Sequence, residues 1–114
     1  MAKKKAAAKD APVTITVVPQ TSICIAAPGS APVGVGGKVS WTNNTGGLVT
    51  VYFPHDGVLG RRRFEKDIED GETYIHPEPA KKKGSGEQRY TYAVYSEITK
   101  NFAIGGSDPD IIVG

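Results

Sequence analysis

Short runs of alternating apolar and polar residues, each closed by a turn signal, constrain the fold of this chain more than any other feature. In residues 13–17 valine and isoleucine alternate with threonine, and in residues 38–43 Val39 and Trp41 share one side. A period of two is typical of a strand with one buried face, and no long stretch keeps the period of a helix. The sequence therefore predicts β-strands.

About seven such segments are separated by glycine, proline and asparagine. They lie at residues 13–17, 22–26, 38–43, 48–53, 72–75, 89–95 and 110–113. Fourteen Gly and eight Pro residues among 114 favour turns over helices. This spacing predicts an all-β chain, an antiparallel Greek-key β-sandwich. Trp41 is the largest candidate for its core.

The length of 114 residues fits one domain, which a basic arm precedes. Residues 1–11, MAKKKAAAKDA, offer no large apolar side chain for a core, so we expect a disordered arm there. One sandwich domain at residues 12–114 should follow. The formal net charge is +2 and residues 1–10 alone carry +3, so the remainder of the chain sums to −1.

The cysteine content and the hydropathy pattern bear on the compartment. Cys24 is the only cysteine, so the chain cannot form an internal disulfide. The basic N-terminus lacks the apolar run of an export signal, and no window is long and apolar enough to span a membrane. We therefore expect a cytoplasmic protein that does not insert into a membrane.

The order of two hairpins resembles the cupredoxin fold, the β-sandwich of blue-copper proteins and of their copper-free relatives. The first consists of residues 37–44, GKVSWTNN, and residues 49–53, VTVYF. The second consists of residues 90–94, YTYAV, and residues 108–113, DPDIIV. The resemblance extends in layout over residues 12–113, and it implies a fold rather than a function.

The same resemblance implies that the copper ligands are missing. The first histidine ligand of the family would fall at about Val49, the cysteine at about Val94 and the second histidine near Glu97. A trigonal copper site needs two imidazole nitrogens and a thiolate sulfur, usually with an axial methionine. Here Cys24 precedes both histidines, and the only methionine is Met1, so we expect neither copper nor another cofactor.

The remaining reactive side chains have simpler explanations. His55 and His76 could in principle bind zinc or type-2 copper, but their spacing is not a metal-ligand pattern and turns commonly expose histidine. Cys24 between two isoleucines is typical of a small buried apolar residue. Four nearby carboxylates have the pattern of a solvated strand edge or turn rather than of a calcium loop: Glu65, Asp67, Glu69 and Asp70. We predict no catalytic residue and no metal ligand.

Three runs of cations could contact a polyanion, either a nucleic acid or an acidic partner. They are Lys3, Lys4 and Lys5 in the arm, then Arg61, Arg62 and Arg63, and finally Lys81, Lys82 and Lys83. No aromatic residue is interleaved with them as a stacking platform, and lysine runs commonly serve as solubilising arms or guard a sheet edge. The sequence leaves open whether these runs form one surface.

Three tyrosines, Tyr90, Tyr92 and Tyr95, are the main candidates for an interface. Together with Tyr52 and Tyr74 they could line an exposed recognition face, or they could pack across strands with only their hydroxyl groups in water. The favoured hypothesis is a non-catalytic, copper-free module for protein interaction or structure, with another protein as its partner at a sheet face or edge. Polyanion binding through the arm and the basic loops is the alternative.

Overall fold

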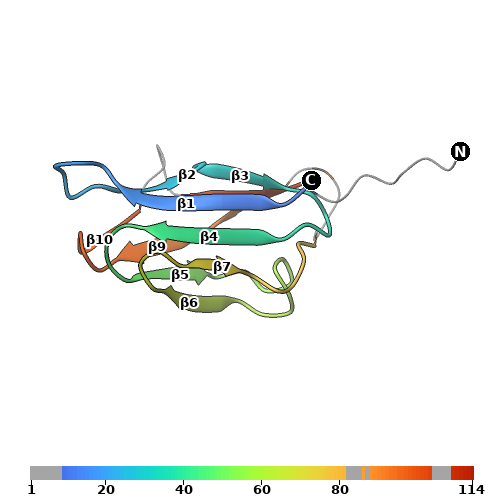
Figure 1. Cartoon of the computed structure of the whole chain (residues 1–114). Coiled ribbons are helices and arrows are strands. Elements are labelled where there is room, and N and C mark those ends of the chain that lie inside the picture. Colours follow the sequence, from blue (N-terminus) through green and yellow to red (C-terminus); the bar gives the residue numbers. More distant parts are fainter. Residues whose placement is uncertain (1–8, 82–85, 87, 104–108) are drawn as a thin grey trace, which may run out of the picture.

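The computed structural model describes residues 9–81, 86, 88–103 and 109–114, which form strands joined by turns and irregular segments (Figure 1). The eleven strands in this part are β1 (Ala11–Val17), β2 (Cys24–Ala27), β3 (Ser30–Val33), β4 (Val39–Asn44), β5 (Val49–Phe53), β6 (Phe64–Ile68), β7 (Thr73–Ile75), β8 (Gln88–Thr91), β9 (Ala93–Ser96), β10 (Asn101–Phe102) and β11 (Asp110–Val113). Among the same residues no apolar helix reaches the length needed to cross a membrane. The predicted all-β class is confirmed.

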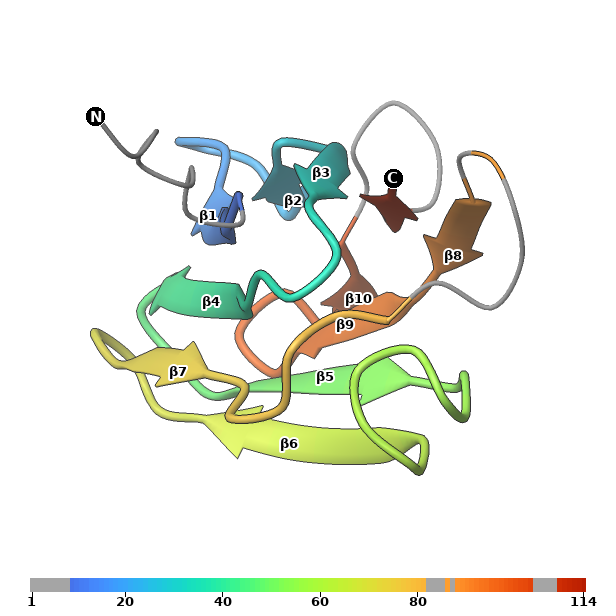
Figure 2. The same ribbon diagram turned by 90° about the vertical axis from the view of Figure 1, so that its right-hand side faces the viewer.

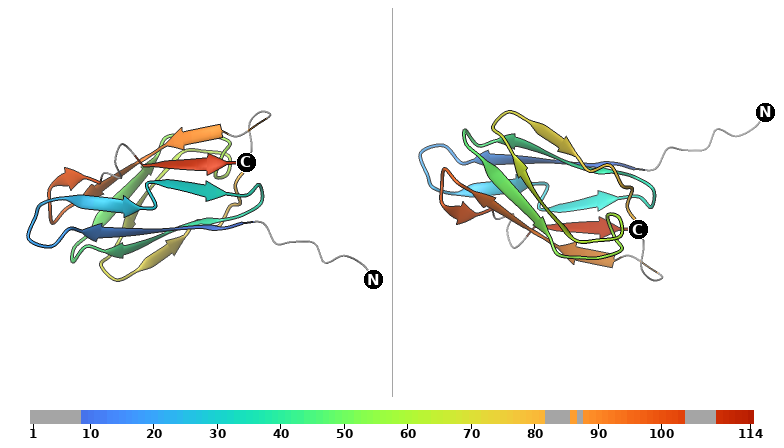
Figure 3. Two further views of the ribbon diagram at one scale, coloured as in Figure 1. Left: turned by 90° about the horizontal axis from the view of Figure 1, so that it is seen from above. Right: turned by 90° about the horizontal axis from the view of Figure 1, so that it is seen from below.

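Three hydrogen-bonded sheets enclose one interior, as the end view in Figure 2 shows. Their strand orders are β2-β1-β4-β7, β10-β9-β5-β6 and β3-β11-β8. In Figure 3 the strands of the β5 sheet run obliquely to β1, as expected when twisted sheets pack face to face. The arrangement is a β-sandwich.

Two strand pairs are parallel, which the prediction of an antiparallel sandwich did not include. β1 pairs with β4, and β3 pairs with β11, in parallel register. The other pairs of named strands are antiparallel. Parallel neighbours need a long connection, and the passage through β2 and β3 supplies one between β1 and β4.

The predicted strand at residues 89–95 is divided between two sheets. β8 pairs with β11 and β9 pairs with β5, so the chain crosses from one sheet to the other at Tyr92. β2 and β3 are divided in the same way, because β2 pairs with β1 and β3 with β11. Strands that switch sheets form the corners of a sandwich. Eleven strands are found where about seven were predicted, because residues 89–95 form two strands and because β3, β6 and β10 lie outside the predicted segments.

Trp41 is fully buried, as predicted, and other rings surround it. Its ring stacks on Tyr74 with 6.4 Å between centroids, and it meets Tyr92 edge-on at 5.5 Å and Phe64 edge-on at 6.1 Å. Aromatic pairs in such arrangements contribute about 0.5–1.5 kcal/mol each beyond the burial of their surface. The layers therefore pack around one indole ring.

The folded part begins slightly earlier than the predicted boundary at Pro12. β1 begins at Ala11, and the two residues before it already bond to the body of the domain. Gly34 N donates to Lys9 O at 2.8 Å, and Lys38 N donates to Asp10 Oδ1 at 2.9 Å. Residues 1–8 of the predicted arm lie outside the described residues.

Candidate functional site

The alternation of buried and outward residues along β5 shows which side chains lie on the outer face of the β10-β9-β5-β6 sheet. Val49, Val51 and Phe53 are buried in the core. Successive side chains of a strand point to opposite faces, so Thr50 and Tyr52 point outward. The register of the neighbouring strands then decides which residues share this face.

Three rings lie on this outer face. Tyr52 is opposite Ala93, and Thr50 is opposite Tyr95, which in turn is opposite Phe102 on β10. The rings of Tyr95 and Phe102 meet edge to face with their centroids 5.2 Å apart. Opposite and diagonal neighbours on one face of a sheet are within reach of aromatic side chains. Tyr52, Tyr95 and Phe102 therefore form a staggered row across three strands, in which Tyr95 is opposite Phe102 and Tyr52 is diagonal to Tyr95.

Two shallow hollows lie along this row. One of about 350 Å³ lies between Tyr52 and Phe102, over Ala93 and Pro109. The other lies beside Phe102 and is lined by Ile23. Phe102 is 57% exposed, Ile23 44% and Tyr52 36%, so large apolar side chains meet solvent here. We refer to Tyr52, Ala93, Tyr95, Phe102 and Ile23 as the aromatic face.

β6 gives the aromatic face an acidic border. Glu65 is opposite Tyr52, and Asp67 is opposite Thr50, whose hydroxyl donates to Asp67 Oδ1 at 2.7 Å. β6 is the last strand of its sheet, and charged side chains protect such an edge against pairing with another chain. The solvated strand edge predicted for these carboxylates is found here.

Two of the three tyrosines predicted for an exposed face belong instead to the core. Tyr90 is 8% exposed and Tyr92 is 2% exposed, because both lie on the inward side where β8 passes into β9. Burial raises the pKa of Tyr92 to about 12. The placement on an exposed face is wrong for these two, whereas Tyr95 and Tyr52 lie on the aromatic face. Sequence reasoning missed Phe102, which no sequence pattern signals.

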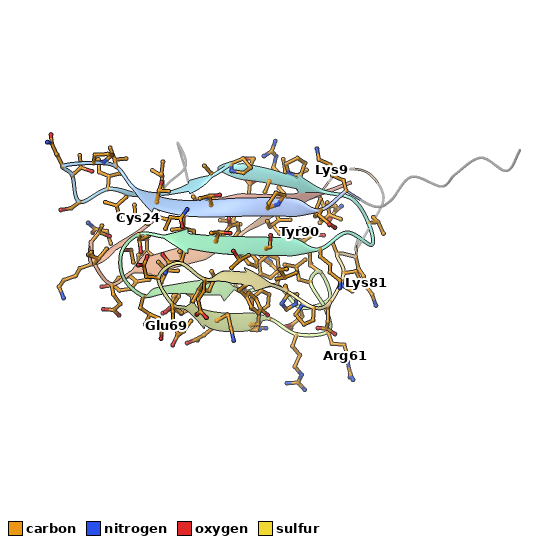
Figure 4. The ribbon with its side chains drawn as sticks, in the orientation of Figure 1. Lys9, Cys24, Arg61, Glu69, Lys81 and Tyr90 are labelled. Atoms are coloured by element: carbon orange, nitrogen blue, oxygen red, sulfur yellow. The ribbon has the colours of Figure 1, made fainter. Side chains whose placement is uncertain are left out.

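A second surface lies at the end of the sandwich where β1 begins, and Figure 4 shows Lys9, Arg61 and Lys81 there. Backbone hydrogen bonds hold the segments of this end together. Gly34 N donates to Lys9 O at 2.8 Å, and Lys81 N donates to Val58 O at 2.7 Å. We call this surface the basic end, and its exposed cations are Lys9, Lys38, Arg61, Arg62, Arg63 and Lys81.

The basic end contains those predicted polyanion contacts that the structure describes. Arg63 pairs with Asp56 at 3.2 Å, and hydrogen bonding between the two side chains lowers the pKa of Asp56 and raises that of Arg63. Sequence reasoning missed Lys38, whose place depends on long-range bonding to residues 9–11. The remaining predicted contacts lie outside the described residues: Lys3, Lys4, Lys5, Lys82 and Lys83.

His76 is a buried structural group rather than an exposed turn residue, whereas His55 is half-buried. His76 is 6% exposed and stacks on Phe64 with ring centroids 4.2 Å apart. Its Nε2 lies 2.7 Å from Leu59 O and its Nδ1 2.8 Å from the Tyr74 hydroxyl, so both ring nitrogens are engaged. His55 Nε2 lies 2.6 Å from a backbone carbonyl oxygen, that of Thr91.

The cysteine is buried, as predicted from its isoleucine neighbours. Burial raises the pKa of the Cys24 thiol, and a hydrogen bond with Ser96 opposes part of that rise. A thiol with a raised pKa is mostly protonated near neutral pH and is a weak nucleophile. The environment of Cys24 therefore matches a packing role.

A comparison with solved structures finds a protein of similar fold. The Cu(I) form of an amicyanin mutant, a cupredoxin, matches with a TM-score of 0.52 and 15% sequence identity, over 90% of this chain and 82% of that chain. At this identity the match shows a cupredoxin-like fold and no more. No protein-family model and no curated protein matches the sequence.

The residues of this chain do not fit the copper centre that the fold implies. Val49 and Val94, to which the resemblance carries two of the ligands, are fully buried and have no side-chain donor atom. Glu97, near the third position, is exposed. Cys24 adjoins Ser96, whereas His76 lies beside Arg61 at the basic end. Within the described residues no three His, Cys, Asp or Glu side chains are grouped so that they could hold a metal ion.

Proposed function

We propose that this cupredoxin-like sandwich is a non-catalytic, copper-free protein-interaction module that binds its partner through the aromatic face. The observation that carries the proposal is the staggered row of Tyr52, Tyr95 and Phe102 on three adjacent strands, in which Tyr52 and Phe102 are exposed and Tyr95 is half-buried. An outward sheet face normally carries polar side chains. Adjacent exposed rings with an apolar hollow between them favour a binding role instead.

The composition of the aromatic face suits a protein partner. Large rings bring contact area with few rotatable bonds, and tyrosine adds a hydroxyl group that can hydrogen-bond at the margin. Glu65 and Asp67 border the rings on one side. A complementary partner would combine an apolar centre with cationic or hydrogen-bond-donating groups at one margin.

The core behind the face keeps these side chains in place. Val49, Val51 and Val94 are fully buried under the same strands. Side chains on a rigid, well-packed sheet lose less conformational entropy on binding than side chains on a mobile loop. The proposed setting is the cytoplasm, where an unpaired thiol such as that of Cys24 remains reduced.

Site-specific photocrosslinking in living cells tests the proposal. A photoreactive phenylalanine analogue replaces Phe102 in one variant and Ile75 in a control, because Ile75 is 61% exposed on β7 of another sheet. We expect a defined crosslinked protein from the Phe102 variant alone. The crosslinked partner is then purified for direct affinity measurement.

The purified partner separates a specific interface from adhesion. Removing an aromatic anchor from the centre of an interface costs about 2 kcal/mol, or roughly thirtyfold in Kd. Phe102→Ser and Tyr52→Ser should each weaken binding by that order, and Ile75→Ser should leave it unchanged. Equal crosslinking from both positions, or affinity insensitive to Phe102→Ser and Tyr52→Ser, would contradict the proposal.

A further inference from the structure

Most of the positive charge in the described part of the chain belongs to the basic end. Of the nine Lys and Arg residues described, six are exposed there, and the other three are Lys66, Arg89 and Lys100. Lys3, Lys4, Lys5, Lys82 and Lys83 lie outside the described residues. The net charge of residues 11–114 is −1, so the net charge alone does not reveal this local excess of cations.

The concentration is built into the fold. The segments around Lys9, Lys38, Arg61 and Lys81 are far apart in sequence, yet backbone bonds join them at this end. Besides the bonds to Lys9 and Val58 described above, Gly36 N donates to Ala80 O at 2.8 Å. Leu59 also forms a β-bridge with Ala80. These bonds fix where the cationic side chains emerge.

Few carboxylates at this end neutralise the cations. Asp56 pairs with Arg63, and Asp10 accepts a hydrogen bond from the backbone N–H of Lys38. Glu78 lies over the Cα of Gly60. Within the described part of the chain, no ion pair is formed by five of the cations: Lys9, Lys38, Arg61, Arg62 and Lys81.

The end of the sandwich opposite the basic end is acidic. The resulting charge asymmetry orients the molecule so that its basic end faces an anion. The turn between β6 and β7 carries exposed Glu69, Asp70 and Glu72, and Glu97 N bonds to Leu48 O beside it. Glu69 lies well away from Arg61 in Figure 4. A charge distribution of this kind steers a polyanion to the basic end and away from the acidic border of the aromatic face.

We propose that the basic end binds the phosphodiester backbone of double-stranded nucleic acid without reading its sequence. Arg61 and Arg62 offer forked guanidinium donors, and the lysines offer point charges, both of which suit phosphate oxygens. Phe64, which follows Arg63 in sequence, is stacked on His76 and only partly exposed. Tyr52, which lines a hollow with Arg63, lies on the aromatic face. The cations of this end thus offer phosphate contacts, with a single exposed ring at their margin rather than a platform of several rings on which unpaired bases stack.

The binding is measured by fluorescence anisotropy with two labelled duplexes of unrelated sequence. Each phosphate contact on B-form DNA adds about 0.9 to the salt dependence of binding, so five contacts give a slope of log K against log salt near −4 or steeper. Both duplexes should give the same affinity. A salt-independent affinity, or a strong preference for one duplex, overturns the proposal.

Paired charge variants locate the contact. Arg61→Gln with Arg62→Gln removes two cations from the basic end, and Lys66→Gln with Lys100→Gln removes two cations elsewhere. The first pair should lower the magnitude of the salt slope by about 2, and the second should leave it unchanged. Thermal unfolding of each variant confirms that the fold is retained. Equal losses in both variants would overturn the proposal.

Competition identifies the class of anion. Unlabelled duplex should displace the labelled duplex at a far lower concentration of negative charge than poly-glutamate does. If poly-glutamate competes equally well, the basic end recognises acidic protein segments and the nucleic-acid proposal is wrong. Phe102→Ser should bind the duplex normally, so this inference and the proposed protein interface can fail independently.

Discussion

The aromatic face and the basic end differ in how the chain builds them. The aromatic face belongs to a regular sheet, where the register places Tyr95 opposite Phe102 and Tyr52 diagonal to Tyr95 on the same side. The basic end consists of loop segments that long-range backbone bonds hold together. One surface therefore depends on periodicity and the other on contacts between distant residues. Variants that damage one surface and spare the other test this difference.

The largest effect is expected from the core that both surfaces share. Trp41→Ala removes a fully buried indole that contacts three other rings. The free energy of unfolding should fall by about 3–5 kcal/mol, as for other large-to-small aromatic changes in cores. Urea unfolding followed by circular dichroism measures the loss. A loss below about 1 kcal/mol would mean that the two layers do not depend on Trp41.

High pH should destabilise the fold through Tyr92, the buried tyrosine at which the chain crosses between sheets. The pKa of Tyr92 is about 12 in the folded chain, above the ordinary value of about 10, because burial disfavours the phenolate. The neutral phenol therefore stabilises the fold fully below pH ~10, and this contribution of about 2–3 kcal/mol is lost as the pH rises through ~12. Stability curves of the wild type and of Tyr92→Phe measure it. The wild type should lose stability in that window, and the variant should lose less; identical curves would contradict the assignment.

A single glycine should disturb the basic end and leave the aromatic face intact. Gly60 has a φ of +95°, and an added Cβ would collide with the Glu78 carboxylate. Gly60→Ala should cost about 2 kcal/mol and displace the adjacent arginines. Gly71→Ala is the matched control, because its φ is +81° but open space surrounds the position. Duplex affinity should fall for Gly60→Ala only; a parallel fall for Gly71→Ala would show a global effect.

The smallest change concerns the exposed ion pair at the basic end. Asp56→Asn removes the partner of Arg63. Exposed pairs contribute little to stability, so the unfolding midpoint should hardly move. The freed guanidinium can then contact one more phosphate, and the duplex salt slope should steepen by about 1. A shallower slope would indicate that Asp56 positions Arg63 for binding.

The sequence predicts the all-β class because most of the strands show the same local alternation of apolar and polar residues. Alternation in residues 13–17 and 38–43 is a property of neighbouring residues, so it survives into β1 and β4. The parallel pairing of these two strands could not be predicted in the same way. It depends on where the chain returns after β2 and β3, which no local pattern encodes.

The candidate surfaces are less predictable, for a related physical reason. Tyr95 and Tyr52 follow the period of their own strands, but Tyr90 and Tyr92 turn inward because the chain changes sheets between β8 and β9. Phe102 belongs to a two-residue strand too short to show a period. The basic end joins residues far apart in sequence, so its contiguity emerges only in the folded chain.

A titration of the isotope-labelled protein with duplex, followed by amide chemical shifts, tests most directly the claim that two separate binding surfaces share this sandwich. The account predicts shift changes at Lys9, Lys38, Arg61 and Lys81. The amides of Tyr52, Tyr95 and Phe102 should remain unmoved. Changes that spread across the β10-β9-β5-β6 sheet, or that centre on its rings, would show a single surface and contradict the account.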